Sequence, residues 1–303
     1  PNVIDHQQLS RRFEEALAHQ HNALRYAEET DDLRLRARAT CRLGIIQWRY
    51  GQYQAARTTL PAALQLSESL QDKAAMARAL SSLGGVHWEQ DDLEQALIFV
   101  EQAARIYDEI GDRIGRANMA GNLALIYSRL GRFDAALAAN QFDLDVATEL
   151  GDRHGIATTL GNRGSIYEAQ HSFELALTCY QQAQEIEREL GNNWDAARQA
   201  AAIAHLQHLV GNDDAALDGF ESALPVLNAH GALYYVVQPL LDSAEIHHSR
   251  SADATAIELN RSAYGIAREL GLQALAERSL ALATKLGDSL AGTGERSLRL
   301  PAN

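Results

Sequence analysis

The sequence predicts an all-α fold, an αα-hairpin solenoid, because three residue patterns recur along it in one register. Each has a period of 40 residues, without an insertion or deletion over most of the 303-residue chain. The first is an alanine: Ala16, Ala56, Ala96, Ala136, Ala176, Ala216 and Ala256. The second is a small residue 12 positions earlier: Gly44, Gly84, Ala124, Gly164, Ala204 and Ala244. The third is an aliphatic residue 10 positions after the alanine: Leu66, Ile106, Val146, Ile186, Val226 and Ile266.

Each pattern has a structural reason. Small side chains let the two helices of a hairpin cross closely, and the aliphatic residues fill the space between consecutive hairpins. A glycine ends most units, where it favours the left-handed conformation that stops a helix: Gly111, Gly151, Gly191, Gly231 and Gly271. In Gly111-Asp112 and Gly151-Asp152 an aspartate follows at once, so its carboxylate is placed to cap the next helix.

The period divides each unit into two helices joined by a short turn. First helices are expected at 32–50, 72–90, 112–130, 152–170, 192–210, 232–249 and 272–287. Second helices are expected at 12–28, 53–70, 93–110, 133–150, 173–190, 213–228 and 254–270. Residues 1–11 are expected to be the end of a preceding first helix. Residues 1–287 are expected to form the solenoid and residues 288–303 a disordered tail or linker.

Three prolines interrupt this pattern. Pro61, Pro225 and Pro239 fall inside expected helices, and we expect each to kink its helix or to shift a helix boundary.

The composition narrows the classes of function. Hydrophobic residues make up 46% of the chain and charged residues 22%, as in folded soluble proteins. The net charge of −13 argues against direct binding of nucleic acid, which needs a positive surface. No apolar stretch approaches the ~20 residues of a membrane helix. Cys41 and Cys179 lie more than three units apart, so we expect both to be buried, unpaired thiols in a reducing, cytoplasmic location.

Two stretches carry a resemblance to a known family. Asn122-Leu123-Ala124 with Tyr127, then Gly131-Arg132-Phe133 and Ala136, resemble the tetratricopeptide repeat, as do Asn162, Gly164, Tyr167, Phe173 and Ala176. The resemblance covers residues 12–287. The unit is six residues longer than the usual one, and is similar to that of Pins-type adaptors and of the sensor arms of bacterial signal-transduction ATPases and transcription regulators.

The resemblance implies a right-handed superhelix of about seven repeats, whose first helices line a concave groove. Such grooves usually hold a peptide segment of a partner protein. In the bacterial sensor arms the groove instead holds a small inducer or packs on the attached ATPase module.

By the same analogy, the groove is lined by arginine, asparagine, tryptophan and histidine at equivalent positions of the first helices. The candidates are Arg38, Trp48, Arg78, Trp88, Asn118, Asn122, Asn162, Arg198 and His208. Arginine offers forked donors to carboxylates, asparagine pairs with peptide amides, and tryptophan gives large contacts. These types favour an acidic peptide. The arginines could instead pair with nearby acids, and the tryptophans could be packing residues.

The sequence carries no recognisable catalytic or metal-binding motif. His205 and His208 share a helix face, and His247 and His248 are adjacent, but no cysteine or carboxylate completes a metal site at a known spacing. No phosphate-binding loop and no nucleophile elbow occurs. The acidic pairs Asp31-Asp32, Asp91-Asp92 and Asp213-Asp214 stand at expected helix starts, where they favour the helix dipole.

The expected function is therefore that of a non-enzymatic scaffold that binds a protein or peptide partner and needs no metal or cofactor. The alternative is a ligand-sensing regulatory arm, linked in its parent protein to an ATPase or DNA-binding module.

Overall fold

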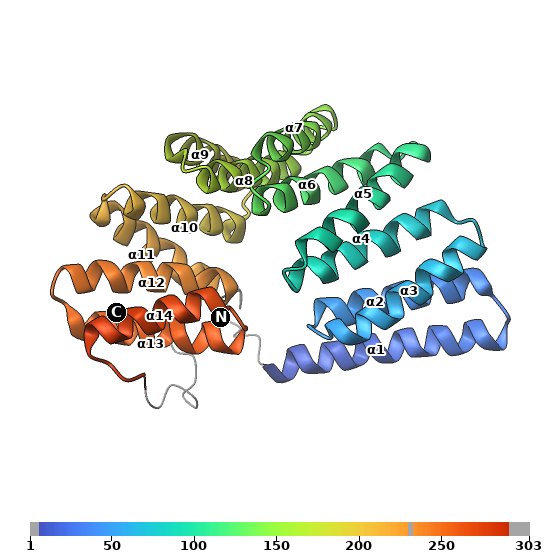
Figure 1. Ribbon diagram of the computed structural model, residues 1–303, viewed down its shortest axis with the longest axis horizontal. Helices are drawn as coiled ribbons and strands as arrows, with labels where there is room; N and C mark the ends of the chain where they lie inside the picture. The colour runs from blue at the N-terminus through green and yellow to red at the C-terminus, as the bar shows by residue number, and fades with distance from the viewer. Residues whose placement is uncertain (1–5, 230–232, 291–303) are drawn as a thin grey trace. The chain divides into compact units, whose positions relative to one another are not determined.

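The computed structural model describes residues 6–229 and 233–290, and every regular element in these residues is an α-helix (Figure 1). The helices are α1 (His6–Glu29), α2 (Leu33–Arg49), α3 (Tyr53–Ser69), α4 (Lys73–Glu89), α5 (Leu93–Glu109), α6 (Arg113–Arg129), α7 (Phe133–Glu149), α8 (Arg153–Ala169), α9 (Phe173–Glu189), α10 (Asn193–Leu209), α11 (Asp213–Ala229), α12 (Tyr234–Ser249), α13 (Asp253–Glu269) and α14 (Gln273–Leu286). Apart from the start of α1, every boundary lies within two residues of its expected place. The all-α, hairpin-repeat prediction is confirmed.

The helices pack in chain order within two compact units. Residues 6–171 belong to the N-terminal unit, with α1 to α8, and the described residues between 172 and 290 belong to the C-terminal unit, with α9 to α14 (Figure 1). In the first, α2 packs on α3, α4 on α5 and α6 on α7, and α2 also touches α4. In the second, α10 packs on α11 and α12 on α13, and α12 touches α14.

Local signals end and restart the helices as expected. Gly111 and Gly151 take φ angles of 71° and 66° in the left-handed region. The carboxylate of Asp112 accepts the backbone N–H of Gly115 at 2.8 Å, which caps α6. Asp31 and Asp91 replace the glycine at two junctions and also have positive φ. Gly231, which belongs to the same column, lies outside the described residues.

The small residues mark a close approach between the two helices of a hairpin. A Cβ atom on Gly44 would lie 2.6 Å from the side chain of Leu60, and one on Gly84 would lie 2.5 Å from Val100. Ala136 is fully buried in a cluster with Ala124 and Ile166. A larger side chain at these positions would push the helices apart.

One expectation is wrong, and for two of the prolines the expected shift of a helix boundary is not observed. Residues 6–11 continue α1 and do not form a separate helix. No glycine or proline separates them from residue 12, so the helix has no reason to end there. Residues 1–5 lie outside the described residues. The prolines Pro61 and Pro225 lie inside α3 and α11 without moving the ends of these helices. Both prolines are exposed. Proline has no N–H, so the carbonyl four residues before each proline has no helical donor and can face water instead.

The third proline, Pro239, also lies inside its helix, α12. After α14, Asp288 accepts the guanidinium of Arg261 at 2.9 Å, and residues 291–303, most of the expected tail, lie outside the described residues. None of the described helices has the length and hydrophobicity needed to span a bilayer.

The hairpin crossing can be tested at Ala136. Replacing it with leucine should lower the free energy of unfolding by about 1–3 kcal/mol through overpacking, measured by urea denaturation. Ala138, two residues away on α7, is exposed, so Ala138→Leu is the matched control and should change little. An equal effect of both variants would contradict the assigned crossing.

Candidate functional site

Charge is divided between the two helix layers of the N-terminal unit. The first helix α2 contains five arginines and no acidic residue, and α6 contains three arginines and no acidic residue. The second helix α7 contains four acidic residues and no lysine or arginine. The acidic chain therefore carries a basic layer of first helices. An anionic partner would be attracted to this layer.

Three arginines on α2 and α4 lie together on this layer. Arg38 and Arg42 are one turn apart on α2, and both are exposed, as is Arg78 on α4. Burial raises the pKa of the Cys41 thiol, and the charges of Arg78 and Arg42 act against this, so both guanidinium groups lie near Cys41. Within the described part of the chain, none of the three arginines forms an ion pair. The alternative that Arg38 and Arg78 are neutralised by neighbouring acids is not observed there.

Asparagines extend the row on α6 and α8. Asn118 and Asn122 are one turn apart on α6 and exposed, and neither side chain makes a hydrogen bond to any described residue. Asn162 on α8 is half-buried. Exposed asparagines in the middle of a helix, where they are otherwise disfavoured, leave their amide groups free for a ligand.

The two tryptophans are packing residues in this structure. Trp48 is half-buried and lies against Gly85 of α4, where a Cβ atom would stand 2.3 Å from the indole ring. Trp88 is half-buried beside the cluster that contains Leu97 and Met119, and the guanidinium of Arg129 lies 5.4 Å from its ring centroid. Glycine at position 85 is thus the complement of the large ring at position 48.

Arg198 in the C-terminal unit is enclosed by aromatic rings. Its guanidinium lies 6.0 Å from the ring centroid of Trp194 and 5.9 Å from that of Tyr235, and its Nε is 3.6 Å from Asp195. Trp194 and Tyr235 pack edge to face at 5.7 Å. Arg198 therefore has contacts of its own, unlike Arg38 and Arg78.

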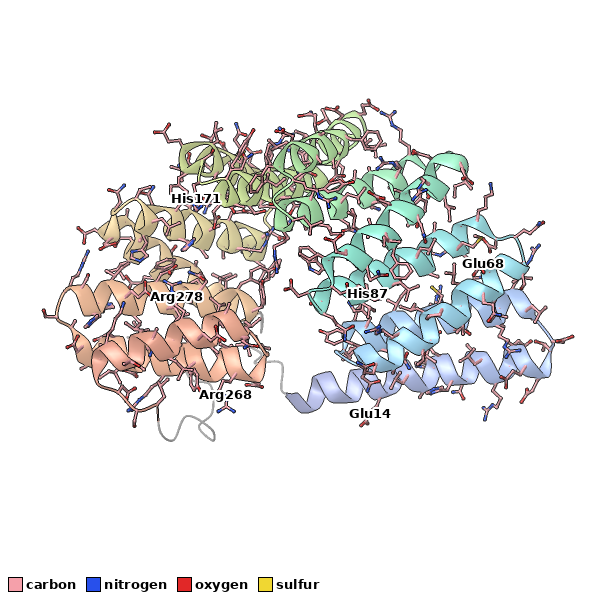
Figure 2. The ribbon with its side chains drawn as sticks, in the orientation of Figure 1. Glu14, Glu68, His87, His171, Arg268 and Arg278 are labelled. Carbon is pink, nitrogen blue, oxygen red and sulfur yellow. The ribbon has the colours of Figure 1, made fainter. Side chains whose placement is uncertain are left out.

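His208 belongs to a polar network between α10, α12 and α14. Arg278 on α14, labelled in Figure 2, makes a two-pronged contact with Glu245 at 2.9 and 2.7 Å and also donates to Asp242 at 2.8 Å. Asp242 is fully buried and also contacts His205 at 2.7 Å and Gln238 at 2.8 Å. Burial alone would lower the pKa of Arg278, but the bonds to Glu245 and the charge of Asp242 raise it above its usual value.

This network includes a possible set of metal ligands that the sequence spacing did not indicate. Ligand atoms of His208, Asp242 and Glu245 lie within 4.8 Å of one another. However, Arg278 already occupies both carboxylates, and His208 Nδ1 contacts Asp213 at 2.8 Å. The arginine supplies the positive charge that a cation would bring, so the group is closed as it stands.

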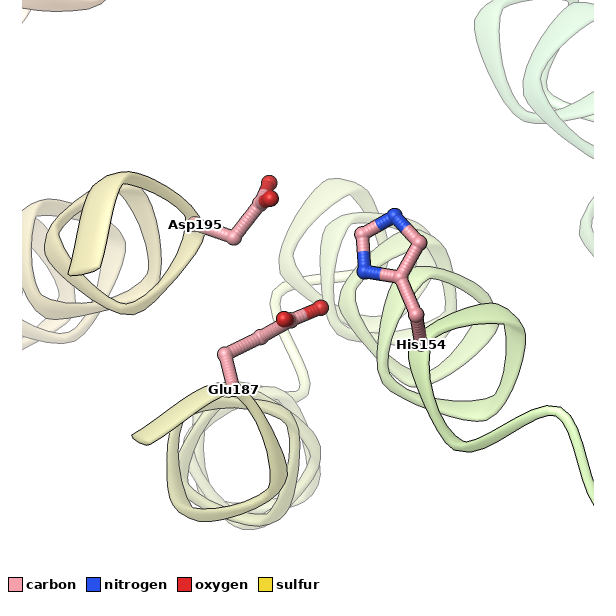
Figure 3. A group of neighbouring side chains, drawn as sticks. All are labelled: His154, Glu187 and Asp195. Atoms are coloured by element: carbon pink, nitrogen blue, oxygen red, sulfur yellow. The ribbon is translucent and has the colours of Figure 1, made fainter. Parts of the chain in front are cut away.

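A second acidic pair lies at the junction of α9 and α10. Glu187 is buried at the end of α9 and accepts the side-chain amide of Asn192 at 2.7 Å, while Asp195 lies in the first turn of α10 (Figure 3). Figure 3 also draws His154, which belongs to α8 of the other unit. Asn192 stabilises a carboxylate that would otherwise be costly to bury.

Sequence reasoning missed Arg278 and Glu245, although a signal was present. Arg278 stands at the same repeat position as Arg38, Arg78, Asn118 and Arg198, two units after Arg198. Extending the column to the last helix would have found it.

The Arg278 network can be tested by removing the guanidinium. Arg278→Met should lower the free energy of unfolding by about 1–3 kcal/mol, because Asp242 stays buried and keeps only neutral donors and the His205 ring. Thermal and urea unfolding measure the change. Arg250→Met is the control, since Arg250 pairs on the surface with Asp214, which is 92% exposed, and should cost under about 1 kcal/mol. An unchanged Arg278→Met protein would show that the network contributes no stability.

Comparisons with known proteins agree with this architecture. The family model of the tetratricopeptide repeat matches residues 51–109, 75–142, 115–189 and 155–229, which together span more than half of the chain. No curated protein sequence gives a match.

Several solved structures share the fold at low sequence identity. The chain is similar to NprR in complex with its cognate peptide NprX, with a TM-score of 0.66 and 16% identity over 93% of this chain and 80% of that one. It is similar to a Rap protein complexed with competence and sporulation factor, with a TM-score of 0.62 and 14% identity over 97% and 90% of the two chains.

A third similar structure is a larger protein. It is a signal transduction ATPase with numerous domains, with a tetratricopeptide repeat sensor, from Pyrococcus horikoshii. The TM-score is 0.63 and the identity 14%, over 94% of this chain but only 44% of that chain. The matched family model, the 40-residue period and the stacked hairpins lead to one conclusion: the chain belongs to the tetratricopeptide repeat family.

Proposed function

We propose that the chain is a protein-interaction scaffold, and that the first helices of its N-terminal unit bind an acidic, extended segment of a partner. The observation that carries the proposal is the row of Arg38, Arg42 and Arg78, which have no ion pair among the described residues, continued by Asn118 and Asn122. Charged donors without acceptors are strong binding groups for carboxylates.

The mode of binding follows from these groups. Arginines fix the acidic side chains of the partner segment, and the asparagine amides pair with its backbone. The proposal gives Trp48 and Trp88 a supporting role, since both already pack within the unit. It assigns no catalytic role and no cofactor to the chain.

Known peptide complexes support this reading. NprR holds its cognate peptide NprX on a similar fold, and a Rap protein of similar fold is complexed with competence and sporulation factor. Their sequence identities of 16% and 14% support peptide binding as a use of this fold, but they do not indicate which peptide this chain binds.

A second candidate function is a regulatory arm. The similar ATPase from Pyrococcus horikoshii carries a tetratricopeptide repeat sensor, and this chain corresponds to 44% of it. In that case the arm is joined to an ATPase or DNA-binding module in its parent protein and reports ligand binding to it.

Peptide arrays test the leading proposal. Wild-type protein should retain acidic peptides above neutral and basic ones of equal length, and retention should fall with added salt. Reversing two charges, in Arg38→Glu/Arg78→Glu, should weaken binding at least about ten-fold, because two charge-assisted contacts become repulsive. Arg105→Glu, an exposed arginine on the second helix α5, is the matched control and should leave binding unchanged.

The asparagines are tested in a pull-down from source-cell lysate. The triple variant Arg78→Ala/Asn122→Ala/Asn162→Ala should lose a partner that the wild type captures, with bound species identified by mass spectrometry. Equal capture by both proteins, or an array without preference for acidic peptides, would refute the proposed face and leave the regulatory arm.

A further inference from the structure

A surface cavity of about 550 Å³, open to solvent, lies on the C-terminal unit between the second helices α9 and α11. Its walls come from α9 and α11 and its floor from α10, three helices that follow one another in Figure 1. The lining includes Gln184, Arg188, Ala196, Ala200, Ser222 and Val226. The volume is within the range of small-molecule sites.

The cavity exists because two large residues of the repeat are alanines in this unit. Leu80, Leu160 and Leu240 occupy the repeat position of Ala200. Met76, Ile156 and Val236 occupy that of Ala196. Leu80, Val236 and Leu240 are buried, so a large side chain at either position normally fills this space.

The wall residues change in the same direction. Gln184 stands where other units have Leu64, Leu144 and Leu224. Ala120 is also small at the repeat position of Ala200. In that unit the guanidinium of Arg116 lies 5.0 Å from the ring centroid of Phe142. The residue at the repeat position of Phe142 in the C-terminal unit is Ser222. The cavity is therefore a property of these side chains and not of the solenoid fold.

Arg188 places a positive charge at the rim. Its repeat position holds Glu68, Asp108, Thr148 and Asn228 in other units, and holds arginine again at Arg268. Among the described residues no carboxylate forms an ion pair with it. The neighbouring Glu187 is absent from the lining, and its carboxylate accepts the amide of Asn192.

From the alanine floor and the arginine rim we infer a binding site for a small amphipathic carboxylate, a molecule with one acid group and a compact apolar body. The apolar body occupies the space above Ala196 and Ala200, and the carboxylate pairs with Arg188. This site lies on α9, α10 and α11, so it is independent of the basic face of the N-terminal unit.

The first test titrates octanoate into the full chain by isothermal calorimetry. Wild type should bind it saturably, with a Kd below about 1 mM. Ala200→Leu introduces the residue that Leu80, Leu160 and Leu240 provide in their units, so it should abolish octanoate binding while the melting temperature stays the same or rises. Circular dichroism confirms that the variant is folded.

The second test separates charge from shape. Arg188→Met should weaken octanoate binding at least about ten-fold and leave binding of octan-1-ol, the neutral counterpart, unchanged. Arg268→Met is the control, because Arg268 holds the same repeat position two units later, on α13 (Figure 2), and does not line the cavity.

Three outcomes would overturn the inference. They are no saturable heat with wild type, equal octanoate binding by wild type and Ala200→Leu, and equal weakening by Arg188→Met and Arg268→Met. Loss of acidic peptide binding in Arg38→Glu/Arg78→Glu with octanoate binding intact would show that the two sites are separate.

Discussion

The close crossing of the two helices in each hairpin is the contact on which the rest of the structure depends. At Gly44 and Gly84 the backbone leaves no room for a Cβ atom, because the side chains of Leu60 and Val100 already occupy its place. This contact recurs every 40 residues, so helix lengths and turns recur with it. Residues at one repeat position consequently line up along one layer, and a row of arginines or asparagines becomes a continuous surface.

The two units use this row in different ways. In the N-terminal unit Arg38, Arg42 and Arg78 have no acidic partner among the described residues. In the C-terminal unit Arg278, at the same repeat position as Arg38, pairs with Asp242 and Glu245. A guanidinium already bonded to the buried carboxylate of Asp242 and to Glu245 stabilises the fold and is unavailable to a ligand. The proposed binding of an anionic segment is thus assigned to the first unit, although the chain as a whole is acidic.

Side-chain volume provides a second means of variation on the same backbone. Where Leu80 and Leu240 fill the space under the second helices, Ala200 leaves it open. The backbone does not change because the hairpin crossing, set by Ala204 and Ala216 in this unit, is intact. A repeat protein can therefore gain a cavity without losing its architecture, at the cost of the packing contacts that the missing side chains would make.

By itself the sequence determined the helix bounds, the hairpin crossing and the family. The helix bounds follow from local signals, such as the capping aspartate Asp112 and the left-handed glycine Gly111. The hairpin crossing and the family follow from the 40-residue columns, which act between adjacent units. It also predicts a binding face with Arg38, Arg78 and Asn122, which stays a prediction. Only the tertiary structure decided which of these groups are already satisfied. Trp48 packs on Gly85, the guanidinium of Arg198 lies beside the rings of Trp194 and Tyr235, and Arg278 bonds to Asp242, 36 residues earlier. The physical reason is that periodicity fixes the direction of a side chain, whereas its partners depend on the neighbouring units, and columns such as that of Arg38, Asn118 and Arg278 meet different charges and sizes there.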